Sequence, residues 1–281
     1  MNKKFLSGFI THFVLIIVSL VSIFPFIWLI STSLKGVNEN IFAYPPVFIP
    51  QDFTWSNYWG VWQKVDFMRY FWNSLAVSGL TVILNLIFSA LAGYPLARMK
   101  FGGKKFFFFA ILATIMVPFQ AIMIPVYLIT VKLGLTDGVS VLNGYIGLVM
   151  PFAVSAFGIF LMRQAFIKIP VDLEESAIVD GCSAFQVFTK VVLPMVKPTL
   201  ALLAVFTFIG SWGEFLWPSV LLTQETMFTL PVGINNLQGV FSSNWRYIAA
   251  GSVLSTIPII VFFLVMQKYF ISGENDGALK G

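Results

Sequence analysis

Very few side chains that could do acid–base or metal chemistry lie inside the long apolar runs of this sequence. Within those runs the ionisable residues are Glu214 and, near the start of the chain, His12. A proton relay uses several intramembrane carboxylates or histidines, and the sequence contains no evident metal-ligand cluster or nucleophile triad. A phosphate-binding G-x-x-x-x-G-K-[ST] loop is also missing. The sequence therefore argues against an enzyme and against ATP hydrolysis by this chain.

The composition predicts an all-α membrane protein. Of 281 residues, 58% are hydrophobic and only 10% are charged, whereas a soluble domain has about 25% charged residues. Most of the uncharged runs exceed the roughly 20 residues that a spanning helix needs. The first run is too long for a signal peptide and lacks a small-residue cleavage site. We expect one transmembrane domain over 1–281 with six helices, at about 8–33, 70–97, 106–131, 140–163, 198–222 and 247–269.

The positive charges predict the orientation of these helices. Most of the 17 Lys and Arg residues fall at the two termini and in the second and fourth loops. Since cytoplasmic loops carry the excess of Lys and Arg, both termini should be cytoplasmic. The net charge of +5 is then a topology signal, and no nucleic-acid partner is needed to explain it.

The fourth loop is the longest cytoplasmic piece, and its first half has the signals of a short helix. Asp172 and Glu175 have the spacing of a capping box and follow a proline, so a helix should begin at Leu173. Gly181 supplies the stop. A second capping box, Ser183 with Gln186, should begin another helix that ends at Pro194.

The second of these helices carries an apolar stripe at spacings of three and four: Phe185, Phe188 and Val192. A small, capped pair of helices is suited to entering a groove on another protein. The alternative is an amphipathic helix lying on lipid, although the nearby acidic residues disfavour an anionic membrane surface.

This loop resembles the EAA motif of permease subunits in binding-protein-dependent ABC importers. That motif is Glu-Ala-Ala, three residues, Gly, nine residues, Ile, any residue, Leu-Pro. The matching positions here are Glu175, Ser176, Ala177, Gly181, Val191, Leu193 and Pro194. Ser176 replaces the second alanine and Val191 replaces isoleucine, and the spacing is kept throughout.

The resemblance extends along the chain through TSLK, NSLAVS, VPFQAIMIPVY, GSWGEFLWP and the ending ISGENDGALKG. These strings are similar to the carbohydrate-uptake branch of the family, and within it to the smaller, six-helix permease exemplified by the second permease of the maltose transporter. One departure is Gly213, where the family pattern has asparagine. The resemblance implies the type I importer permease fold and a bacterial or archaeal cytoplasmic membrane.

By the same resemblance, segment 170–194, called the coupling segment from here on, would dock on a separate ATPase. Glu175 would contact a basic group of the ATPase, Ala177 would pack closely and Gly181 would form the turn. Ser176, Leu193 and Pro194 complete the motif, and Asp180 belongs to the same coupling site. The implied partners are a second homologous permease, two ATPase subunits, an extracytoplasmic sugar-binding protein and membrane lipid. This chain would hold no cofactor, because ATP and Mg would bind to the ATPase.

Two further regions have expected roles. Glu214, surrounded by Trp212, Phe215 and Trp217, could form a sugar-facing wall, since aromatic faces beside a polar group suit sugars. Plain helix packing explains the same residues equally well. The resemblance also implies that the fifth loop, with Asn235, Asn236 and Gln238 at its tip, would reach into the binding protein. The competing function is a secondary carrier that works without ATP.

Overall fold

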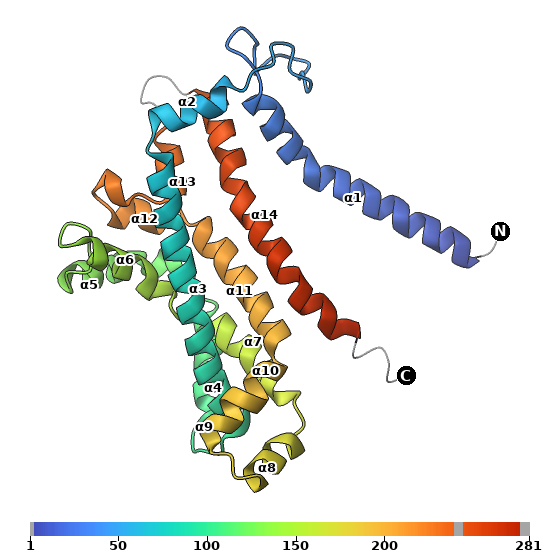
Figure 1. Ribbon diagram of the computed structural model, residues 1–281, viewed down its shortest axis with the longest axis vertical. Helices are drawn as coiled ribbons and strands as arrows, with labels where there is room; N and C mark the ends of the chain where they lie inside the picture. Colours follow the sequence, from blue (N-terminus) through green and yellow to red (C-terminus); the bar gives the residue numbers. More distant parts are fainter. Residues whose placement is uncertain (1–2, 239–243, 276–281) are drawn as a thin grey trace. The chain divides into compact units, whose positions relative to one another are not determined.

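The computed structural model describes residues 3–238 and 244–275. These residues fold into helices joined by short loops, and an isolated β-bridge pairs Lys35 with Phe53. The helices, labelled in Figure 1, are α1 (Lys3–Ser33), α2 (Ser56–Lys64), α3 (Phe67–Arg98), α4 (Lys104–Thr114), α5 (Phe119–Lys132), α6 (Val141–Val149), η1 (Met150–Phe152), α7 (Ala156–Ile167), α8 (Asp172–Val179), α9 (Ala184–Gln186), η2 (Val187–Val192), α10 (Leu193–Met195), α11 (Lys197–Trp212), α12 (Leu216–Leu221), η3 (Glu225–Met227), α13 (Leu230–Asn235) and α14 (Trp245–Asn275).

Two compact units make up the chain. The first contains Met1–Met68 and Gly233–Ile257, and the second contains Arg69–Val232 and Pro258–Gly281. All of the coupling segment and Glu214 lie in the second unit.

Three helices among the described residues are long and apolar enough to cross a membrane on their own. They contain the stretches Ile10–Ser33, Phe67–Arg98 and Trp245–Tyr269, close to the expected spans 8–33, 70–97 and 247–269. Each one includes a proline, at Pro25, Pro95 and Pro258, without breaking. In a membrane helix the freed backbone groups can be satisfied locally, so a proline does not by itself end the helix.

The other three expected spans are bent or broken. The run 106–131 is two helices, α4 and α5, which meet at 98°, and the run 140–163 is α6 with η1 followed by α7, at 56°. Pro118 stands at the N-cap of α5, and Ser155 caps α7 with its side chain. The number of spans is three, or up to six if each bent pair crosses once.

The expected fifth helix, 198–222, is also interrupted. Helix α11 begins after a 75° bend from the helices before it and ends at Trp212, with Gly213 at its C-cap. A separate short helix, α12, follows. Glu214 therefore lies in the break between two helices and not inside one continuous span.

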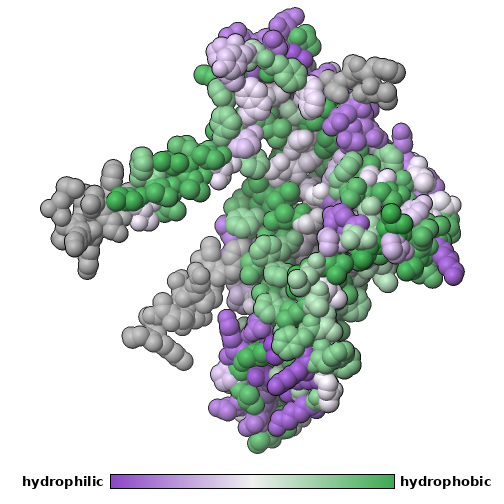
Figure 2. Space-filling model, turned by 180° about the vertical axis from the view of Figure 1, so that it is seen from behind, coloured by the Kyte–Doolittle hydropathy of each residue, from purple (hydrophilic) through white to green (hydrophobic). Residues whose placement is uncertain are grey.

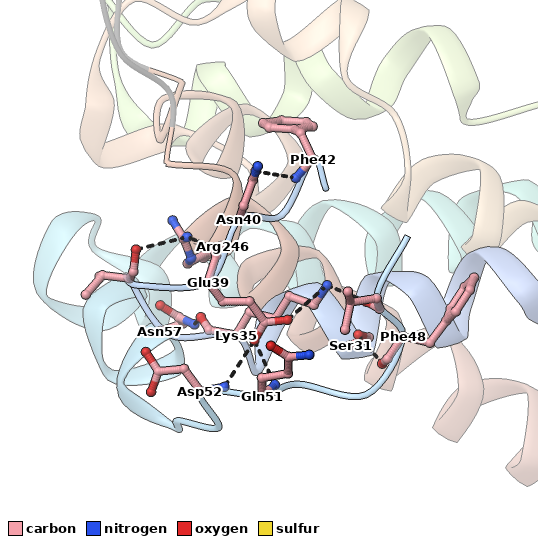
Figure 3. Close-up of polar contacts among 12 residues, drawn as sticks. Ser31, Lys35, Glu39, Asn40, Phe42, Phe48, Gln51, Asp52, Asn57 and Arg246 are labelled. Carbon is pink, nitrogen blue, oxygen red and sulfur yellow. Dashed lines mark hydrogen bonds and ion pairs between the residues drawn. The ribbon is translucent and has the colours of Figure 1, made fainter. Parts of the chain in front are cut away.

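In the first unit, a buried ion pair organises the loop after α1. Lys35 Nζ lies 3.4 Å from Glu39 Oε1, and the other carboxylate oxygen of Glu39 accepts hydrogen bonds from the backbone N–H groups of Gln51 and Asp52 (Figure 3). Burial acts to raise the pKa of Glu39, but the two N–H groups and Lys35 outweigh it, so the pKa is lowered from 4.5. Asn57 adds hydrogen bonds to the carbonyls of Ser33 and Lys35.

Candidate functional site

The coupling segment forms two helical pieces joined by a turn at Gly181. The first capping box is not formed: α8 begins at Asp172, and no side chain caps it. The second box is formed, since Ser183 and Gln186 exchange hydrogen bonds. The helical stretch ends at Met195, one residue after the expected end at Pro194, because the π-helix η2 continues into α10, which contains this proline. The wider π turn accommodates a residue that has no N–H to donate.

Gly181 adopts a conformation that favours glycine. Its φ is +87°, in the left-handed region that other L-residues avoid. The N–H of Cys182 donates to the carbonyl of Ala177 and that of Gly181 to Ile178, which is the Schellman pattern at a helix end. The prediction of a glycine stop for the first helix is confirmed.

One face of α8 is free in the described structure. Glu175, Ser176 and Asp180 are exposed, together with Ile178 at 59% and Val179 at 87%. Ala177, between them, is buried. Figure 2 shows hydrophilic and hydrophobic side chains mixed at the end of the second unit that carries α8. Such a mixed, exposed face is suited to a protein partner.

The apolar stripe of the second helical piece is only partly buried. Phe188 and Val192 join the core, but Phe185 is 70% exposed. The core that holds the segment draws on α3, α7, α8, η2 and α11, through residues that include Ala90, Met162, Phe166, Ala177, Val187, Phe188, Val192 and Leu203. The segment is therefore packed onto the membrane helices of its unit.

A buried charge pair ties the first turn of α8 to the end of α3. Glu174 Oε1 lies 2.6 Å from Arg98 Nε, and Tyr94 donates a 2.9 Å hydrogen bond to Glu174 Oε2. Arg98 also donates to the carbonyl of Ile169. This pair was not predicted from the sequence. The only signal was a second glutamate next to Glu175 in a chain with few charges, and nothing in the sequence indicated Arg98 as its partner.

Glu214 lies on a pocket of the second unit with a volume of about 490 Å³. Its Oε1 accepts a 3.0 Å hydrogen bond from the backbone N–H of Trp217. Trp212 and Trp217, expected beside it on a sugar-facing wall, are 2% and 0% exposed and belong to the core. Trp217 packs on Phe119 and donates to the carbonyl of Gly147. For these two residues the packing alternative describes the structure, and Phe215 is 39% exposed.

A buried carboxylate that the sequence analysis did not single out fixes the start of the fifth loop. Asp137 accepts hydrogen bonds from the N–H and hydroxyl of Thr223 and from the N–H of Gln224, at 2.7–3.0 Å. The side chain of Gln224 donates back to its carbonyl. This loop is therefore anchored where it leaves α12.

The expected loop tip in the first unit is exposed at Asn235, Asn236 and Gln238. Residues 239–243 lie outside the described part of the chain. Within that part, no group of three or more His, Cys, Asp or Glu side chains could hold a metal ion.

The described residues thus form long apolar helices together with a short helical segment whose α8 face is exposed. Residues 85–273 match the family model described as "Binding-protein-dependent transport system inner membrane component". The chain belongs to this family, which confirms the resemblance drawn from the EAA-like motif.

Curated relatives and solved structures agree with this assignment. The chain is 36% identical over 265 residues to the arabinooligosaccharides transport system permease protein AraQ of Bacillus subtilis, covering 94% of this chain and 92% of AraQ. The AraQ protein of Halalkalibacterium halodurans is 34% identical over 266 residues, covering 94% and 93%. A chain in the crystal structure of a bacterial ABC transporter involved in the import of the acidic polysaccharide alginate matches with a TM-score of 0.80 and 28% identity, covering 96% of this chain and 99% of that chain.

Proposed function

We propose that this protein is one permease half of an ATP-driven ABC importer for a sugar, and that the coupling segment connects it to a separate ATPase. The observation that carries the proposal is the exposed acidic and apolar face of α8, which stands on the EAA-like motif of a family member. Two curated relatives are named for transport of arabinooligosaccharides. A small oligosaccharide is therefore the proposed substrate class.

The coupling segment has separate residues for docking and for attachment. Glu175, Ser176 and Asp180 face outward for the ATPase, whereas Ala177 and Leu193 pack inward. The buried Glu174–Arg98 pair joins the same helix to α3. A displacement of α8 by the ATPase would then move the cytoplasmic end of α3, because the pair and the shared core do not allow the two to slide independently.

The remaining partners follow from membership of the family. We propose a second homologous permease, two ATPase subunits that bind ATP and Mg, and an extracytoplasmic sugar-binding protein. We also propose six spans with both termini on the cytoplasmic side, so that Asn235, Asn236 and Gln238 would lie on the side of the binding protein. This chain is a non-catalytic subunit of a cytoplasmic (inner) membrane complex.

The test is uptake of labelled arabinotriose into proteoliposomes that contain this chain with its co-purifying subunits. We expect uptake that requires both ATP inside the vesicles and the binding protein outside. Uptake driven by a sugar or ion gradient with no ATP would contradict the proposal and favour the secondary carrier.

A further inference from the structure

We infer that the pocket beside Glu214 is a sugar subsite contributed by this chain, and that Glu214 makes it select neutral sugars over acidic ones. This inference rests on the proposed function and deepens it. The pocket lies entirely within the second unit. It is built from α3, the α4–α5 break, the η1–α7 connection and α11 with the break that follows it. It therefore lies at two of the bends described above and at the end of α11.

The pocket has the size and lining of a small-molecule site. Its volume of about 490 Å³ falls within the range of about 300–1,000 Å³ that is usual for ligand pockets. Four phenylalanines supply apolar ring surface: Phe119, Phe152, Phe157 and Phe206. These rings take the place of the tryptophans expected from the sequence, and their faces suit the C–H surface of a sugar ring.

Polar groups from two helices line the pocket. Thr207, Ser211 and Glu214 follow one another at intervals of four and three residues, so they line one face of α11 and the residues just after it. Thr81 and Asn85 come from α3, and the hydroxyl of Thr81 already donates to the carbonyl of Val77. A sugar in the pocket would find its hydroxyl partners on α11.

The groups on the α11 side are available to a ligand. The hydroxyls of Thr207 and Ser211 make no hydrogen bond with the described part of the chain, and both residues are half-buried. By contrast, Asn85 is committed to the protein: its amide donates to the carbonyl of Phe152 and its oxygen faces Ser89 and Ser155. Asn85 therefore shapes the pocket, whereas the α11 side offers the free donors and acceptors.

Charge gives the pocket its selectivity. Glu214 is its one charged lining residue, and no Lys, Arg or His of the described chain lines it. The Trp217 N–H holds one carboxylate oxygen of Glu214 in place. A carboxylate in a partly desolvated wall repels a second carboxylate strongly, while it accepts hydrogen bonds from neutral hydroxyls. Uronic acids and sugar phosphates are therefore disfavoured.

Thiol labelling tests the subsite without depending on transport. Ser211→Cys would be made in a Cys182→Ala background, which removes the single native cysteine, and the full chain would be labelled in nanodiscs with its co-purifying subunits. The probes are a cationic (2-aminoethyl) and an anionic (2-sulfonatoethyl) methanethiosulfonate. Ser219→Cys, on the exposed side of α12, is the matched control. If Ser211→Cys fails to assemble, Thr207→Cys one turn earlier replaces it.

We expect the cationic reagent to label Ser211→Cys at least about tenfold faster than the anionic one, relative to Ser219→Cys. Adding Glu214→Gln, which keeps an oxygen for the Trp217 N–H, should remove most of that difference. Arabinotriose should slow labelling, and trigalacturonate should do so only in the Glu214→Gln variant. Equal rates with both reagents, no labelling, or no protection by arabinotriose would overturn the inference. Equal protection by the two sugars without Glu214→Gln would overturn the selectivity. If vesicle uptake proves independent of ATP while protection persists, the proposed function fails and the subsite stands.

Discussion

At the scale of single residues, two adjacent glutamates have opposite surroundings. Glu174 is buried against Arg98 and Tyr94, whereas Glu175 faces outward on α8. The motif in the sequence indicates Glu175 but not Glu174. A pair formed across 76 positions leaves no local pattern, so its partner was not predictable from sequence. The partners of Asp137 were not predictable either, because Thr223 and Gln224 are far away in the sequence.

Substitution of the two glutamates, one at a time, should show that Glu174 contributes to stability and Glu175 does not. Glu174→Ala leaves Arg98 partly buried without its partner, which should cost about 3 kcal/mol of unfolding free energy. Glu175→Ala should change that free energy by less than about 0.5 kcal/mol, because the side chain is exposed. Denaturant unfolding of the purified protein, followed by tryptophan fluorescence, measures both. Equal losses in the two variants would contradict the assignment of Glu174 as the anchor.

At the scale of elements, the sequence predicted the three long spans well and the bent ones poorly. An uninterrupted apolar run fixes α1, α3 and α14. Prolines, however, do not show by themselves where a helix bends: Pro125 lies inside α5, while Pro118 precedes its first residue. Whether a proline lies inside a helix or at a bend depends on how the helix packs against other elements. The turn at Gly181 was predictable because a helix that ends in left-handed backbone favours glycine at that one position.

Close packing of α6 can be tested at a glycine. A Cβ on Gly147 would lie 2.0 Å from the backbone oxygen of Leu135, whereas a Cβ on Gly79 of α3 meets nothing within 4 Å. Gly147→Ala should therefore cost at least about 2 kcal/mol, and Gly79→Ala should be neutral or slightly stabilising because alanine favours a helix. The same unfolding measurement compares them. A Gly147→Ala protein as stable as Gly79→Ala would show that α6 does not approach Leu135 this closely.

The loop after α1 should lose stability in acid. The pKa of Glu39 is lowered from 4.5, so the folded state binds fewer protons than the unfolded state. The stabilisation is complete above the unfolded value and is lost as pH falls through the folded-state pKa. Thermal unfolding between pH 6 and pH 3 should therefore show a larger decrease for the native chain than for Glu39→Gln. Identical pH dependence in the two proteins would contradict the role of this carboxylate.

At the scale of the whole molecule, membership of the importer family and the exposed α8 face lead to one account. We propose that a chain with no phosphate-binding loop in its sequence receives energy from a separate ATPase through the coupling segment. One domain with six spans and cytoplasmic termini stay predictions of this account. The family was predictable from sequence because the EAA-like spacing is a local pattern. The pocket was not, because it needs side chains from four separate parts of the chain.

The measurement that tests the account most directly is ATP hydrolysis by the reconstituted complex, with and without sugar-loaded binding protein. We expect Glu175→Lys to lower the stimulated rate by about tenfold or more, because it reverses the charge at the proposed ATPase contact, while the permease remains folded. Lys132→Glu, a charge reversal at an exposed residue on the side expected to be outside, should leave the rate within about twofold. Stimulated hydrolysis that is unchanged by Glu175→Lys would contradict the claim that the coupling segment connects this protein to its ATPase.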